Sequence, residues 1–192
     1  MSYLVILAML LVIVLASVIA LFLLIGAIVV NIMVRVPYAP TQQERVKKII
    51  DQFNLQPGQK FYDIGCGDGR MLLEAEKRGA TAIGFEISPW AFLKAKLNIW
   101  LNQSSARVLY KNFYHVTMTD ADAVFCFLIN TVMPTVEKKL RAELRPGATV
   151  VSYAFPMPTW QPTQVLDVSA KGRGSNVYVY VKNWKQVVKG TD

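Results

Sequence analysis

From Met1 to Val34 the chain contains no charged side chain, and this absence constrains the fold more than any other feature of the sequence. Between Tyr3 and Val30 nearly every residue is apolar. A helix over this run, at about 1.5 Å per residue, exceeds the roughly 30 Å hydrocarbon core of a bilayer. The sequence therefore predicts a transmembrane anchor over residues 1–34, followed by a soluble part that carries every charge.

Two alternatives to an anchor are a cleaved signal peptide and a soluble hydrophobic hairpin. A signal peptide has a positively charged start and a shorter apolar stretch, and this chain has neither. Basic residues follow the run only on its C-terminal side, at Arg35, Arg45, Lys47 and Lys48. Because positive flanks stay on the cytoplasmic side, we expect a single-pass protein with its N-terminus outside and its soluble part in the cytoplasm or mitochondrial matrix. The two cysteines, as free thiols, fit such a reducing compartment.

Residues 35–58 are predicted to leave the membrane and to begin a soluble domain. Pro37 and Pro40 prevent the first helix from continuing, because proline lacks the amide donor. The segment Thr41–Glu44 has the spacing of a helix capping box. Apolar residues then recur at helical spacing, which predicts an amphipathic helix packed on a core. These residues are Val46, Ile49, Ile50 and Phe53.

Beyond residue 59, apolar runs of strand length alternate with helical patterns up to the C-terminus. Predicted strands cover 60–64, 81–87, 106–113, 121–129, 148–155, 163–168 and 177–182, and predicted helices cover 70–78, 89–102 and 132–144. This alternation indicates a three-layer α/β fold around a mostly parallel sheet. We expect residues 59–192 to form this one domain.

The segment from Phe61 to Arg70 is the most informative stretch, a predicted strand that turns through glycines into a helix. Its glycines at positions 65, 67 and 69 let the backbone turn sharply and approach a ligand. The spacing differs from the Gly-x-Gly-x-x-Gly fingerprint of dinucleotide sites. Asp63, which begins the turn, would repel a pyrophosphate and suits a ligand with an ammonium group.

Glu86 ends the second predicted strand, beside this turn. A carboxylate there can accept hydrogen bonds from both hydroxyls of a ribose. An adenosine that carries an amino-acid tail and no phosphate fits both acids, and S-adenosylmethionine is such a molecule. The alternative is an acidic cap and turn glycines in an ordinary α/β fold.

Through Asp63, the three glycines and Glu86 the sequence resembles the class I, seven-stranded S-adenosylmethionine-dependent methyltransferases, whose sheet is Rossmann-like. Four longer segments extend the resemblance over nearly the whole chain. They are 36–41, 63–70, 84–90 and 156–162. In these segments the chain is similar to the mitochondrial protein-lysine methyltransferases that modify adenine nucleotide translocase and the ATP synthase c subunit, which also carry a hydrophobic N-terminal segment.

The resemblance implies a role for individual residues toward the cofactor. Asp63, Gly65 and Gly67 are expected on its methionine side, and Glu86 on its ribose. Asn112 falls where related enzymes place an acid near the adenine amino group, and an amide oxygen can also accept that hydrogen bond. The expected cofactor-binding set is completed by Cys66, through its backbone, and by Ile87 and Phe113.

Tyr38 and Trp160 are the candidate catalytic residues, as an aromatic wall for the acceptor lysine. The resemblance places their proline-rich segments beside the active site, and an aromatic face steadies a partly cationic amine. The alternative for either residue is an aromatic at the edge of the core.

His115, the one histidine, is a candidate base or a surface loop residue. The sequence shows no metal-ligand spacing.

The chain carries 21 basic and 13 acidic residues, a net charge of +8, and its basic residues are scattered. This pattern favours an anionic membrane surface over nucleic acid as a partner. The resulting hypothesis is a membrane-anchored enzyme that uses S-adenosylmethionine to methylate lysine in a membrane protein. The alternatives are a methyltransferase for a small molecule or lipid, and a cofactor-binding module without activity.

Overall fold

The computed structural model describes residues 3–33, 43–168 and 176–183. Its helices, including two short 3₁₀ turns named η, are α1 Tyr3–Met33, α2 Gln43–Asp51, α3 Arg70–Glu76, α4 Pro89–Leu101, η1 Phe113–His115, η2 Asn130–Val132 and α5 Met133–Glu143. Its strands are β1 Lys60–Ile64, β2 Thr81–Glu86, β3 Arg107–Tyr110, β4 Ala123–Cys126, β5 Thr149–Tyr153, β6 Gln164–Asp167 and β7 Asn176–Val181.

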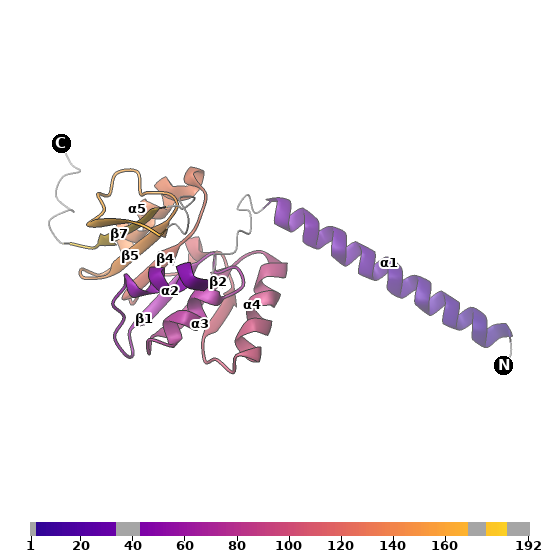
Figure 1. The fold of residues 1–192 in the computed structure, drawn as a ribbon. Helices are drawn as coiled ribbons and strands as arrows, with labels where there is room; N and C mark the ends of the chain where they lie inside the picture. The colour runs from indigo at the N-terminus through magenta and orange to yellow at the C-terminus, as the bar shows by residue number, and fades with distance from the viewer. Residues whose placement is uncertain (1–2, 34–42, 169–175, 184–192) are drawn as a thin grey trace.

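The seven strands form one sheet in the order β3-β2-β1-β4-β5-β7-β6. Strands β1 to β5 pair in parallel, whereas β7 is antiparallel to both β5 and β6. The chain between parallel strands returns through helices, which cover the sheet on both faces (Figure 1). The predicted three-layer, mostly parallel fold is confirmed.

Two hydrophobic clusters lie on opposite faces of the sheet, because neighbouring residues of a strand point to opposite sides. Phe61 and Phe125 belong to the cluster that α2, α3 and α4 cover. Tyr62 and Val124 belong to the other cluster, which α5 covers. Central strands buried on both faces explain why the sequence reads there as continuous apolar runs.

The strands β3 and β4 are shorter than predicted. The parallel pairing of β3 with β2 ends at Tyr110, opposite Glu86. Beyond this pair the chain turns into η1, where the Asn112 side chain caps the turn by accepting a hydrogen bond from the Tyr114 amide. The pairing of β4 with β5 likewise ends at Cys126.

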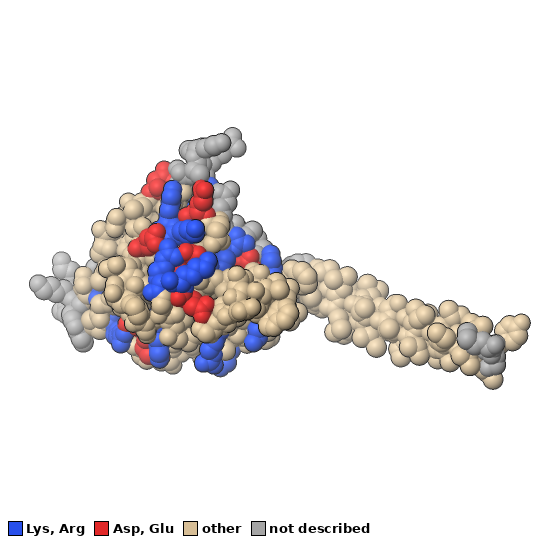
Figure 2. All heavy atoms as spheres, turned by 60° about the horizontal axis from the view of Figure 1, so that its bottom comes forward, with Lys and Arg blue, Asp and Glu red and all other residues tan. Residues whose placement is uncertain are grey.

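Helix α1 projects away from the sheet domain (Figure 1). The span Tyr3–Val29 is long and apolar enough to cross a membrane, and none of its most apolar stretch is buried in the structure. In Figure 2, the visible surface of α1 carries no charged atoms, whereas basic and acidic side chains are interleaved on the visible face of the domain. The proline-rich exit, the Thr41 cap and Tyr38 lie outside the described residues.

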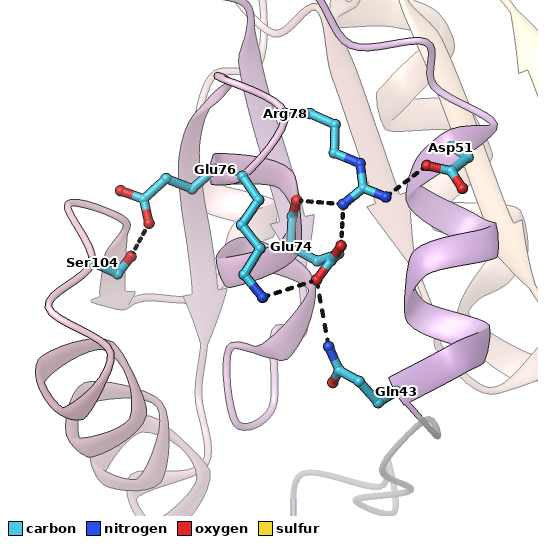
Figure 3. A network of polar contacts seen from close by, with 7 residues as sticks. Gln43, Asp51, Glu74, Glu76, Arg78 and Ser104 are labelled. Atoms are coloured by element: carbon cyan, nitrogen blue, oxygen red, sulfur yellow. Dashed lines mark hydrogen bonds and ion pairs between the residues drawn. The ribbon is translucent and has the colours of Figure 1, made fainter.

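Helix α2 is attached to α3 by apolar and polar contacts. Its residues Val46, Ile49 and Ile50 are fully buried, as the helical spacing predicted. Arg78 pairs with the buried Glu74 and, at 2.7 Å, with Asp51 of α2 (Figure 3). Burial raises the pKa of Glu74, but hydrogen bonds from Arg78 and Lys77 outweigh this effect and lower it overall. Helix α2 is therefore fixed to the sheet domain.

Candidate active site

The predicted cofactor residues meet at the carboxyl edge of the sheet, where β1 and β2 end side by side. The strands are parallel neighbours, with Asp63 opposite Gly84 and Ile64 opposite Phe85. The glycine turn follows β1 and leads into α3 at Arg70. Because parallel strands bring their carboxyl ends to the same edge, Asp63 and Glu86 come together although they are far apart in sequence.

The turn after β1 needs its glycines. Gly65, Gly67 and Gly69 have φ angles of 84°, 56° and 78°, in the left-handed region that side chains disfavour. A Cβ on Gly65 would also lie 3.0 Å from the Leu128 side chain. The amide of Gly65 donates to the Phe85 carbonyl at 2.9 Å, which joins the turn to β2.

Cys66 packs its side chain against β2, directly over Gly84. A Cβ on Gly84 would lie 2.6 Å from the Cys66 sulfur, so glycine is required there. Burial, followed by the charges of Asp63 and Glu86, raises the pKa of the Cys66 thiol well above its usual value. The thiol is thus an apolar packing group, and the expected contact of the Cys66 backbone with a cofactor stays a prediction.

The Glu86 carboxylate supports the turn through the backbone. It accepts a hydrogen bond from the Gly67 amide at 2.9 Å, and bonds from the Ile87 and Ser88 amides at 2.8 Å each. A carboxylate has about four acceptor positions, so the three bonds leave capacity for a ribose hydroxyl. Glu86 therefore shapes the turn in addition to its expected contact with the cofactor, which stays a prediction.

Asp63 is the group in the site that most clearly fits a cationic ligand. Its side chain is 1% exposed, and its Oδ1 atom has no hydrogen-bond partner among the residues that the structure describes. Burial, followed by the charges of Glu86 and Asp68, raises the pKa of Asp63 well above its usual value. A buried acceptor without a partner is costly, and an ammonium group would satisfy it. The amino-acid tail of S-adenosylmethionine carries this group.

Asp68, which the sequence analysis did not single out, fixes the turn to α3 and α4. Its carboxylate pairs with the Arg70 guanidinium at 2.5 Å and lies 3.9 Å from the Lys94 amine. The Asn98 side chain of α4 donates to the Asp68 carbonyl at 2.9 Å. The acidic Asp68 and the basic Arg70, on either side of Gly69, were the signal available in the sequence.

The remaining predicted cofactor residues follow β2 and β3 at the same edge. Ile87 and Phe113 are half-buried, and the Phe113 ring lies 4.2 Å from that of Tyr114, centroid to centroid. Asn112 already accepts one hydrogen bond within η1. A second lone pair on its amide oxygen remains for an adenine amino group, so this role stays a prediction.

The predicted aromatic residue of the acceptor side, Trp160, is a core residue in the structure. It is 2% exposed, and its ring centroid lies 5.4 Å from that of Tyr180. This placement agrees with the alternative of an aromatic at the edge of the core. The indole N–H has no hydrogen-bond partner within the described part of the chain.

His115, the candidate base, is exposed in η1.

A buried glutamate that the sequence analysis did not single out holds the proline-rich segment of Trp160. Glu137 of α5 accepts the Thr159 amide at 2.8 Å and also the Thr159 hydroxyl. Burial raises the pKa of Glu137, but hydrogen bonds from Thr159 and Arg141 outweigh it and lower the pKa overall. The segment 156–160 is further held by the Met157 amide, which donates to the Tyr180 hydroxyl at 2.8 Å.

The sheet order, the glycine turn and the two acids at the carboxyl edge define a class I S-adenosylmethionine-dependent methyltransferase. A solved RNA methyltransferase from Salinibacter ruber, in complex with S-adenosyl-L-homocysteine, superposes with a TM-score of 0.71 at 26% identity over 76% of this chain and 95% of its own. This similarity confirms the predicted fold class and cofactor.

Residues 63–164 match the model of the ANTKMT methyltransferase domain, and the chain belongs to this family. The adenine nucleotide translocase lysine N-methyltransferase of Mus musculus is 39% identical over 71% of the chain and 61% of its own length. A protein-lysine N-methyltransferase of Saccharolobus islandicus is 34% identical over 76% of the chain and 93% of its length. The Mus musculus lysine N-methyltransferase of the ATP synthase c subunit is 33% identical over 66% of the chain and 51% of its length.

Proposed function

We propose that this chain is a membrane-anchored, S-adenosylmethionine-dependent protein-lysine N-methyltransferase that acts on a membrane-associated protein. The observation that carries the proposal is the match to the Saccharolobus protein-lysine methyltransferase, which extends over almost that whole protein. The two mouse relatives, named for a translocase and for a component of ATP synthase, support a membrane protein as the substrate class.

The cofactor, when bound, supplies a methyl group on a sulfonium for in-line displacement. The residues of the chain would bind the cofactor and orient it. Asp63 would hold the amino group of the cofactor and Glu86 its ribose, while Asp68 and Asn98 keep the glycine turn in place. Because alignment and exclusion of water account for much of such a rate enhancement, the rigid turn is the main contribution of these residues.

The acceptor lysine has to arrive without its proton. An apolar, partly dry environment lowers the pKa of an amine, so the half-buried aromatic residues at the carboxyl edge would favour the neutral form. Phe113 and Tyr114 lie at this edge beside the predicted adenine site. Tyr38 and Trp160 remain candidates for the aromatic wall, with Glu137 positioning the segment of Trp160.

The membrane part of the proposal is supported by α1. Its span Tyr3–Val29 is long enough to cross a bilayer, and its lack of burial argues against a core helix. Basic residues follow it at Arg35, Arg45, Lys47 and Lys48, which supports a domain on the cytoplasmic or matrix side. Confinement to a membrane raises the effective concentration of partners in the same bilayer.

Transfer from methyl-labelled S-adenosylmethionine in membranes that contain the full-length chain tests the proposal. The expected result is label in a membrane protein, lost with Glu86→Ala and kept with the exposed control Glu44→Ala. Label in the lipid extract would instead support the small-molecule or lipid alternative. Cofactor binding without transfer to any fraction would support the non-catalytic module.

A further inference from the structure

Helix α4 exposes apolar side chains on the face that points away from the sheet. They are Trp90, Leu93, Leu97, Trp100 and Leu101, and each is between 53% and 73% exposed. The opposite face buries Ala91, Ala95 and Ile99 against the core. Core packing therefore accounts for one face of α4 and leaves the other face, here named the outer stripe, unexplained.

The outer stripe is a continuous surface along the helix. At 3.6 residues per turn, its five side chains fall within an arc of roughly 100° and extend over about 15 Å of the helix axis. Lys94 and Lys96 border the arc on its two sides. An apolar arc with bordering lysines and tryptophans is typical of helices that lie in the interface between water and lipid.

The charge around α4 matches an anionic surface. Between Glu86 and Asp120 the sequence contains no acidic residue and four basic ones, Lys94, Lys96, Arg107 and Lys111. This stretch forms α4 and the neighbouring edge strand β3, which contacts it. The exposed Tyr110 of β3 lies beside α4, with its ring 5.4 Å from that of Phe92. The Lys94 amine also lies 3.9 Å from the Asp68 carboxylate, which comes from outside this stretch. The excess of basic residues within the stretch attracts anionic headgroups to this edge of the domain.

The position of α1 brings this edge to the bilayer. Helix α1 contacts α4, and Figure 1 shows α4 on the side of the domain from which α1 projects. The outer stripe is exposed with α1 in place, so α1 is not its cover. A domain tethered by α1 thus has the outer stripe close to the membrane surface.

We infer that α4 docks the domain onto the bilayer, with the outer stripe in the boundary between headgroups and acyl chains and the four basic residues near anionic headgroups. The inference rests on the proposed membrane anchoring. Interfacial helices of this type bury their apolar face roughly 5–10 Å into that boundary.

Docking through α4 has a consequence for the substrate. Helix α4 begins at Pro89, three residues after Glu86, and its Asn98 holds the glycine turn. The cofactor edge of the sheet therefore lies along the docked helix, with the end of β2 at its N-terminus and the glycine turn beside Asn98. The lysine that reaches this edge belongs to a segment at the membrane surface and not to a domain far above it.

A fluorescent probe on α4 tests the docking. The full-length chain carries Leu97→Cys, labelled with an environment-sensitive fluorophore, in vesicles of phosphatidylcholine and phosphatidylglycerol. The native Cys66 and Cys126 are buried and so react slowly. The matched control is Ala142→Cys, an exposed position on α5, which covers the other face of the sheet.

The expected result is a blue shift of the Leu97→Cys probe and loss of its emission when nitroxide-labelled lipid is added, with neither change for Ala142→Cys. If vesicle flotation shows that the chain is inserted but nitroxide-labelled lipid does not quench the Leu97→Cys probe, the docking of α4 is wrong, whereas the membrane anchor is not affected. Shielding of the probe by a second copy, detected by cross-linking, would also overturn it. Because no step requires methyl transfer, the result is independent of the enzymatic activity.

Discussion

The Glu86 carboxylate and the Gly67 amide are joined by a hydrogen bond of 2.9 Å, which links the end of β2 to the glycine turn after β1. The residue expected to bind the ribose is thus also the residue that holds the turn in shape. Its other oxygen accepts the Ile87 and Ser88 amides. Both oxygens of Glu86 therefore face donors, and this arrangement has a direct mutational consequence.

Glu86→Gln is predicted to impair cofactor binding nearly as much as Glu86→Ala. The NH₂ group of a glutamine would have to face either the Gly67 amide or the Ile87 and Ser88 amides. Because both the NH₂ group and these amides are donors, at least one N–H group would lose its hydrogen bond, at a cost of about 1–3 kcal/mol. Calorimetric titration with S-adenosylmethionine measures the loss, with Glu44→Gln on the exposed surface of α2 as control. Binding at the wild-type level by Glu86→Gln would contradict the account of the turn.

Asp63→Asn is predicted to abolish tight cofactor binding and to stabilise the ligand-free protein at neutral pH. The charge-assisted bond to an ammonium group is worth about 2 kcal/mol, or roughly 30-fold in affinity. Because the pKa of Asp63 is raised in the folded state, its destabilising effect is absent at low pH. The destabilisation by Asp63 grows as the pH rises from the usual pKa of an aspartate to the raised pKa of Asp63 in the folded protein.

Thermal unfolding across this pH range checks the prediction for Asp63. The difference in melting temperature between Asp63→Asn and wild type should widen toward high pH, and cofactor should raise the melting temperature of wild type only. Asp167→Asn in the edge strand β6 is the control. Its difference from wild type should not depend on pH, and cofactor should raise its melting temperature as it does that of wild type. If the difference in melting temperature between Asp63→Asn and wild type were the same at every pH, ionisation of the buried Asp63 carboxyl would not be the cause of that difference.

Glu137→Gln is predicted to lower stability with the opposite pH dependence. The pKa of Glu137 is lowered below its usual 4.5, so its contribution is present above that pH and is lost as the pH falls through the lowered pKa. We expect a loss of about 1 kcal/mol at pH 7 that fades in acid. Unfolding by urea at pH 7 and in acid measures it, with the exposed Lys138→Gln as control.

Gly84→Ala is predicted to displace Cys66 and to weaken cofactor binding without a change in any polar group of the site. The added methyl group would meet the Cys66 and Leu72 side chains at less than 3 Å. Overpacking of this kind costs about 1–3 kcal/mol. Unfolding and cofactor titration together check the prediction. If the cofactor affinity is unchanged, the packing of Cys66 against Gly84 does not determine the shape of the glycine turn.

Trp160→Phe distinguishes an acceptor role from a core role. Phenylalanine keeps most of the apolar volume, so the fold should survive, whereas truncation to alanine would cost about 3–5 kcal/mol. From its burial we expect lower stability with cofactor affinity and methylation kept. Loss of methylation at unchanged cofactor affinity would assign Trp160 to the acceptor site.

The sequence predicted the elements of the fold closely because the central strands are buried on both faces. Phe61 lies in a short run between Gly58 and Gly65, and Val124 lies in a mostly apolar run between Asp120 and Asn130. The ends of β3 and β4 were predicted too far along the chain. Their last pairs, Tyr110 with Glu86 and Cys126 with Ser152, depend on neighbouring strands that a local pattern does not contain.

The convergence of Asp63 and Glu86 was predictable from the order of strands and helices, which indicated a parallel sheet. Asp63 lies one residue before the end of β1 and Glu86 ends its parallel neighbour β2, so the topology alone brings them together. The bond between Glu137 and Thr159 joins residues 22 positions apart through tertiary packing, which no spacing rule indicates. The outer stripe of α4 was missed because apolar residues in a predicted helix read as core.

Measurement of N-methyl-lysine in membrane proteins tests the central claim most directly. Membranes that contain the full-length chain are incubated with S-adenosylmethionine carrying a deuterated methyl group, and peptides are analysed by mass spectrometry. We expect deuterated methyl-lysine at the membrane surface of an embedded protein, absent with Asp63→Asn and present with Asp167→Asn. Deuterated methyl groups found only in lipid, in small molecules or in nucleic acid would contradict it.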